Sequence, residues 1–110
     1  MPAIEARRRA EVEQDLAAFF ETRFAAPLAA HGIVATAAAR ELFVLTAIAQ
    51  AEAGIVALDS LLPALRRIDL NGVADFYLLK FGARPLSYNR MTRLLGDMHD
   101  KWVALRQRPA

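Results

Sequence analysis

Apolar residues recur at helical spacing along most of the chain, and single glycines and prolines mark where each stretch ends. The longest uninterrupted stretch runs from Ala3 to Ala26. Pro27 lacks a backbone N–H, so we expect a helix over 3–31 that is kinked near this proline or restarts there and stops at Gly32. Its large apolar residues fall every three or four positions and so share one side of a helix: Val12, Leu16, Phe19, Phe20 and Phe24.

Further helices are indicated by capping residues at their starts and by glycines near their ends. Thr36 is the expected N-cap of a helix over 36–53, which is apolar nearly all round and therefore central. The core is expected to centre on its residues Leu42, Phe43, Leu45 and Ile48. The remaining helices are expected over 59–67, 71–81 and 87–107, with N-caps at Asp59 or Ser60, at Asn71 and at Ser87.

No alternating pattern of the kind that strands show extends over more than a few residues, and there is no internal repeat. The sequence therefore predicts an all-α fold, a compact bundle of about five helices, with residues 1–110 forming a single helical domain. Hydrophobic residues make up 55% of the 110 residues, but 23 of them are alanine, so the helices should approach one another closely.

The composition also indicates where such a chain works. It has no cysteine, which excludes disulfides and thiolate metal sites and fits a reducing cytoplasm. The start of the chain is too charged for a signal peptide, and no stretch approaches the about 20 apolar residues of a membrane span. We therefore expect a cytoplasmic protein with no membrane partner, and its high alanine and arginine content is typical of a high-GC bacterial or phage source.

Positive charge is concentrated in the last third of the sequence. The formal net charge is only +2, but residues 80–110 hold seven Lys or Arg and two Asp, which gives +5, whereas residues 1–79 sum to −3. A second basic cluster, Arg7, Arg8 and Arg9, lies near the start. This asymmetry favours an anionic partner.

Catalytic chemistry is not indicated by the residues present. His31 precedes the helix-ending Gly32 and is expected to interact with free carbonyl groups there. His99 lies between Met98 and Asp100 on a helix, so neighbouring carboxylates would point in other directions and not converge on a metal. The five glycines are scattered singly and form no phosphate-binding loop. We expect no enzyme, no cofactor and no metal site.

Residues 80–93 carry the pattern with most bearing on function. A helix ends near Gly82, the chain turns through Pro85, and a capped helix begins at Ser87 with polar and basic residues in its first turns. A helix N-terminus offers free N–H groups to phosphate, and Arg and Asn can reach base edges in duplex DNA. The candidate DNA-binding residues are Lys80, Arg84, Ser87, Tyr88, Asn89, Arg90 and Arg93.

This layout of two helices resembles helix-turn-helix modules and their winged relatives, in which the second helix enters the major groove. The long first helix followed by an apolar central helix is also similar to dimeric winged-helix regulators of the MarR type. Two departures stand out: the connection from Gly82 to Leu86 is longer than the usual tight turn, and no hairpin follows the last helix to form a wing.

Two functions of different classes follow. The first is a homodimeric DNA-binding transcriptional regulator, in which the stripe Val12, Leu16, Phe20 and Phe24 pairs the subunits. The second is a helical module that binds a partner protein, as an adaptor, inhibitor or assembly subunit. It is suggested by apolar residues on more than one side of two short helices: Leu61, Leu62 and Leu65, and Phe76, Tyr77, Leu78, Leu79 and Phe81.

Overall fold

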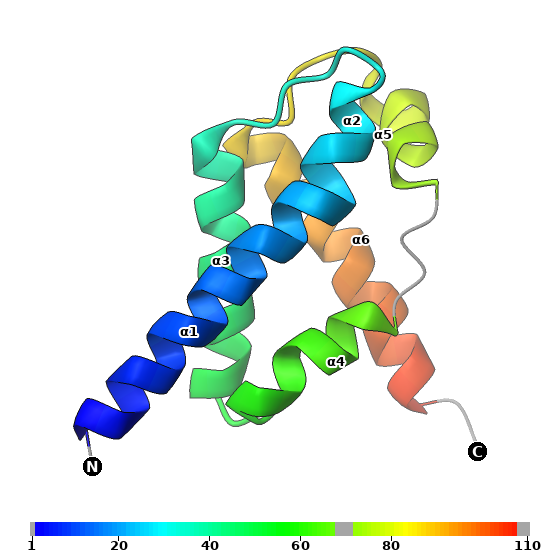
Figure 1. The fold of residues 1–110 in the computed structure, drawn as a ribbon. Helices are drawn as coiled ribbons and strands as arrows, with labels where there is room; N and C mark the ends of the chain where they lie inside the picture. Colours follow the sequence, from blue (N-terminus) through cyan, green and yellow to red (C-terminus); the bar gives the residue numbers. More distant parts are fainter. Residues whose placement is uncertain (1, 68–71, 108–110) are drawn as a thin grey trace.

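The computed structural model describes the backbone of residues 2–67 and 72–107 and the side chains of residues 7–67 and 72–97. Within these ranges the chain is a bundle of helices without a strand, which confirms the predicted all-α fold (Figure 1). No helix in this part is long and apolar enough to cross a bilayer. The elements are α1 (Pro2–Phe20), η1 (Glu21–Ala25), α2 (Ala26–Ala29), α3 (Ala37–Glu52), η2 (Leu58–Ser60), α4 (Leu61–Arg66), α5 (Val73–Phe81) and α6 (Tyr88–Gln107).

The predicted irregularity near Pro27 is present as a change of helical hydrogen bonding. The chain stays helical from α1 to α2, but the turn Glu21–Ala25 is a π-helix in which the N–H of Ala26 donates to the carbonyl of Glu21. Because Pro27 has no N–H to give, the turn before it can widen without losing a bond there. Gly32 then ends the helix at φ 76°, and Ile33 donates back to Leu28 O over 2.9 Å, as predicted for a glycine C-cap.

Four phenylalanine rings form the centre of the core. Phe43 of α3 lies 5.4 Å from Phe24, 5.6 Å from Phe20 and 6.0 Å from Phe19, measured between ring centroids. α3 packs between α1 and α6, so its central position is confirmed. Buried Phe43 and Ile48 agree with the predicted core, and Leu42 is half-buried. Leu45 was wrongly placed in the core: it is 59% exposed, because one side of α3 faces solvent.

The predicted subunit interface on α1 is corrected by the structure. Val12, Leu16, Phe20 and Phe24 are at most 4% exposed within a single chain. They pack against α3, which occupies the side of α1 that a second subunit would need. The stripe is regular because it is the core-facing side of α1, and periodicity alone does not distinguish the two roles.

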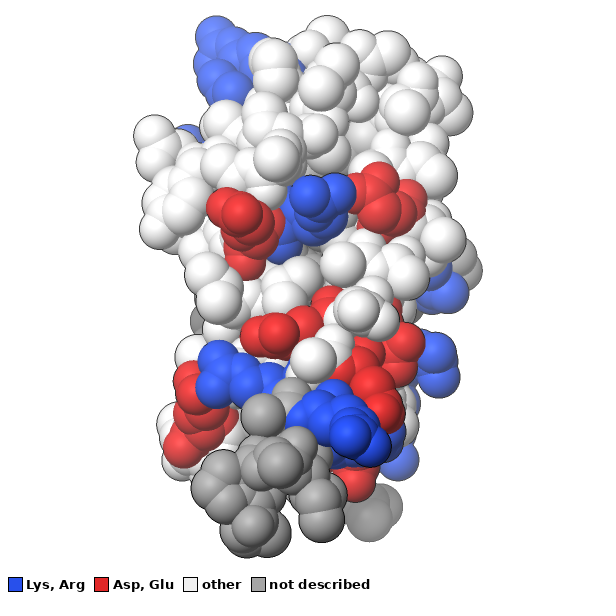
Figure 2. Space-filling model, turned by 60° about the vertical axis from the view of Figure 1, so that its left-hand side comes forward, with Lys and Arg blue, Asp and Glu red and all other residues white. Residues whose placement is uncertain are grey.

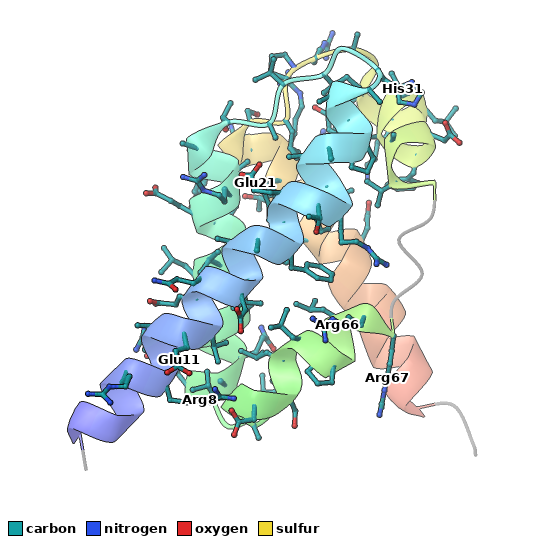
Figure 3. All side chains as sticks on the ribbon, viewed as in Figure 1. Arg8, Glu11, Glu21, His31, Arg66 and Arg67 are labelled. Atoms are coloured by element: carbon teal, nitrogen blue, oxygen red, sulfur yellow. The ribbon has the colours of Figure 1, made fainter. Side chains whose placement is uncertain are left out.

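Ion pairs connect the N-terminal half of α1 to its neighbours. Arg8 pairs with Glu11 (Figure 3) and with Asp59 of η2 at 2.6 Å. Arg9 pairs with Glu52 of α3 at 2.6 Å. Asp59 is therefore engaged with Arg8, and Ser60 makes no capping bond to α4. The basic cluster at the start of the chain is thus largely neutralised by local carboxylates. The predicted N-cap Asn71 lies outside the described residues, and the residue before α5 is Gly72.

Candidate nucleic-acid interface

Two loops that are distant in sequence lie side by side at one end of the molecule, at the top of Figure 1. The N–H of Leu86 donates to Val34 O over 2.7 Å, and the N–H of Thr36 donates to Leu86 O over 3.0 Å, which makes a parallel bridge between Ala35 and Leu86. The Thr36 hydroxyl accepts from Ala39 N–H and donates to Leu86 O, both over 3.2 Å. The predicted cap of α3 is confirmed, and the same hydroxyl also joins the two loops. We call this region the loop end; α3 and α6 both begin there.

The loop before α6 is held by side chains of both helices that flank it. Tyr77 is fully buried and donates its phenol hydrogen to Arg84 O over 2.6 Å. The Arg90 guanidinium donates to Pro85 O over 2.8 Å, and the Arg90 N–H donates to the Ser87 hydroxyl at 3.4 Å. Gly82 turns the chain at φ 70° and ψ −153°, a conformation open to glycine only. The bonds from Tyr77 and Arg90 therefore hold the loop before α6, and with it the first turn of α6, in one position.

Stability should fall as the pH rises above about 10. Burial raises the pKa of the Tyr77 phenol above its ordinary 10.0, and the positive charges of Arg90 and Arg84 partly oppose this. In the unfolded chain the phenol ionises first, so the free energy of unfolding decreases from the unfolded pKa up to the folded one. Urea unfolding measured between neutral and strongly alkaline pH checks this, with Tyr77→Phe as the variant expected to lose much of the dependence. If Tyr77→Phe lost as much stability at alkaline pH as the wild type does, this prediction would be contradicted.

The structure brings most of the predicted DNA-binding residues together at the loop end. Arg84 lies exposed in the loop, and Tyr88, Asn89 and Arg93 are exposed on the first two turns of α6. Ser87 and Arg90 are half-buried and are occupied with fixing the loop. Lys80 is turned away from this group: it forms an ion pair with Asp97 of α6, and its ammonium group lies over the rings of Phe76 and Phe81.

The loop end carries positive charge without neighbouring carboxylates. No Asp or Glu occurs in residues 22–40 or 76–96, the two segments that meet there. In the part of the chain that the structure describes, Arg84, Arg90 and Arg93 have no carboxylate within 4.0 Å. On the face drawn in Figure 2, red atoms occupy the middle and lower parts, whereas the upper end shows only blue and uncharged atoms. The molecule therefore has one end suited to an anion.

The sequence did not predict that the loop from Gly32 to Thr36 and the first turn of α3 form part of the candidate site. Ala37 and Ala38 are exposed in the first turn of α3. Their small side chains leave the backbone N–H groups of that turn open to a ligand. A signal was present in the sequence, since both loops read as a glycine, a short extended stretch, a hydroxyl cap and a helix: Gly32 to Thr36, and Gly82 to Ser87. This likeness indicates similar loops but not that they pair.

Other polar features of the surface do not converge on a reactive centre. Two open grooves of about 420 and 440 Å³ flank η1 and share Thr22 and Arg23. One also reaches His31, in the turn after α2, and the other reaches Arg66 of α4; the two residues lie apart in Figure 3. His31 is exposed, and its predicted capping contact is not seen among the described hydrogen bonds. Among the described residues, no three His, Asp or Glu side chains could share a metal ion, and the side chain of His99 lies outside them.

Comparison with known proteins does not assign the chain to a family: no family model, no curated protein and no solved structure matches it.

Proposed function

We propose that this chain is a non-enzymatic, DNA-binding regulatory protein that contacts duplex DNA with its loop end. The observation that carries the proposal is the pairing of two capped helix N-termini, those of α3 and α6, with arginines that have no carboxylate beside them in the described structure. Duplex DNA presents closely spaced phosphates, and such an end offers both N–H donors and positive charge to them.

The exposed side chains divide between two roles. Arg84 in the loop and Arg93 on α6 are free to reach phosphates, which fix the orientation of a protein on DNA. Tyr88 and Asn89 lie between them on the first turn of α6. Asn can bond adenine in the major groove, and Tyr can pack on sugar or base, so these two are the proposed readers of sequence.

Arg90 acts mainly as a positioning residue in this scheme. Its guanidinium already donates to Pro85 O, so it stabilises the loop that presents Arg84. A guanidinium has five N–H donors, however, and those left over remain available to a phosphate. The backbone N–H groups at the start of α3 supply the second contact, next to the first, through the bridge between the loops.

The test is a titration of a labelled random-sequence DNA duplex with the wild-type chain, followed by fluorescence anisotropy at several salt concentrations. We expect a Kd in the micromolar range at low salt and a log-affinity that falls with log-salt at a slope of about −2 to −4, as for a few released counterions. Absence of binding at low salt would refute the proposal. Binding that does not change with salt would refute the phosphate contacts.

A further inference from the structure

One side of α5 carries apolar side chains that the chain itself does not cover. Leu79 is 88% exposed and Phe76 is 40% exposed. They are three residues apart and therefore lie on the same side of the helix. The opposite side of α5 is buried, because Ala74, Tyr77 and Phe81 pack into the core. This outer side is the part of the predicted protein-binding surface that the structure leaves accessible; Tyr77 and Phe81 belong to the core.

Two opposite charges border this apolar pair. Asp75 and Lys80 are both exposed, one just before Phe76 and the other just after Leu79. The Lys80 ammonium group lies 5.6 Å from the Phe76 ring centroid and pairs with Asp97, so the side chain is held at the edge of the apolar pair. The outer side of α5 therefore has a negative edge, an apolar centre and a positive edge. We call Asp75, Phe76, Leu79 and Lys80 the α5 face.

The order of these residues matches one heptad of a coiled coil, with Asp75 at g, Phe76 at a, Leu79 at d and Lys80 at e. In a parallel pair of helices, a g residue faces the e residue five positions later on the other helix. Asp75 and Lys80 are five positions apart, so a second copy of α5 lying parallel would bring Asp75 of each copy next to Lys80 of the other, whose ammonium group it would share with Asp97. An antiparallel copy would bring each edge against the same edge of its partner, carboxylate to carboxylate.

We propose that the α5 face pairs with the α5 face of a second copy of this chain, with the two α5 helices parallel. Each copy contributes only two large apolar side chains, so the contact is small and the dimer should dissociate on dilution. α5 runs toward the loop end (Figure 1), and a parallel pair therefore turns both loop ends to the same side of the dimer. The pairing stands on α5 alone, whether or not the loop end binds DNA.

The first test is sedimentation of the wild type over a wide concentration range, compared with Leu79→Glu and Leu45→Glu. Leu45 is also exposed, on α3, so its replacement matches the change of size and charge. We expect a monomer–dimer equilibrium for the wild type and for Leu45→Glu, and a monomer for Leu79→Glu at every concentration. A wild type that stays monomeric overturns the proposal and leaves the α5 face to a different protein. Equal loss of association in Leu79→Glu and in Leu45→Glu also overturns the proposal.

The second test fixes the direction of pairing. The chain has no cysteine, so oxidation of Leu79→Cys can join only the two introduced thiols. In a parallel pair the two d positions are adjacent, and we expect a covalent dimer, but none from Leu45→Cys. Asp75→Lys should weaken association by about tenfold or more, because lysine would then face Lys80 of the other copy. A Leu79-dependent dimer that neither crosslinks nor responds to Asp75→Lys overturns the parallel arrangement.

Discussion

Replacing Phe43 by alanine should lower the free energy of unfolding by about 3–5 kcal/mol, because it empties a position at the centre of the core. Phe43 is 1% exposed, and its ring centroid lies within 6.0 Å of those of Phe19, Phe20 and Phe24. Truncation removes its own transfer free energy and leaves a cavity bordered by three rings that are held on α1 and η1. A domain of this size has a total stability of about 5–15 kcal/mol, so the variant should be close to unfolding.

Leu45→Ala is the matched control, two residues further along the same helix. Leu45 is exposed, so its truncation forms no cavity and should change stability by about 0.5 kcal/mol or less. Urea unfolding followed by circular dichroism compares the two variants with the wild type. If Leu45→Ala proved as damaging as Phe43→Ala, the arrangement of α3 with its Phe43 side inward would be wrong.

The starts and ends of the helices could be predicted where a local group fixes them. The helix start at Thr36 and the helix end at Gly32 were predicted correctly, because a hydroxyl cap and a positive-φ glycine each act on backbone groups only a few residues away. The π-helical turn before Pro27 was predicted only as a kink. Proline removes a donor, but this alone does not determine which carbonyl the N–H groups of the preceding turn bond, and in the folded chain Phe24 of that turn packs against Phe43.

Predictions that depended on which neighbour covers a helix were less successful. The apolar run from Leu42 to Ala49 gave no sign that Leu45 faces solvent, since the uncovered side of α3 is set by where α1 and α6 pack. The α1 stripe likewise reads the same whether α3 or a second subunit covers it. Leu79 and Tyr77 have similar apolar surroundings in sequence, yet one is exposed and the other buried.

Of the candidate site, the sequence predicted the start of α6 but not the loop before α3 that pairs with it. The capped start of α6 and its basic residues follow from the sequence around Ser87, and the structure places Arg84, Tyr88 and Arg93 there as exposed groups. The pairing with the loop before α3 joins residues about 50 positions apart, as shown by Ala35 and Leu86. A single backbone bridge of this kind leaves no periodic pattern in the sequence, so only the folded chain reveals it.

The double variant Arg84→Ala, Arg93→Ala should bind duplex DNA about ten- to hundredfold more weakly than the wild type at low salt. Both arginines are exposed, and neither guanidinium group makes a hydrogen bond or ion pair with another described residue; the bond from Tyr77 reaches the backbone carbonyl of Arg84, which alanine keeps. Their removal should therefore leave the fold unchanged, whereas Arg90→Ala would also release the loop at Pro85. Each lost phosphate contact should make the log-affinity against log-salt slope shallower by about 0.9, so the double variant should lose about 1.8.

Arg66→Ala, Arg67→Ala gives a control with the same change of net charge at a different place. Both residues are exposed on α4 and just after it, away from the loop end (Figure 3). If binding is a general attraction between DNA and a positively charged protein, the two double variants should weaken it equally, since distant charges act through the same screened field. If the loop end makes the contacts, only the loss of Arg84 and Arg93 should change the slope. Equal slopes in the two variants would remove the reason for placing DNA at the paired helix N-termini, even if the wild type binds.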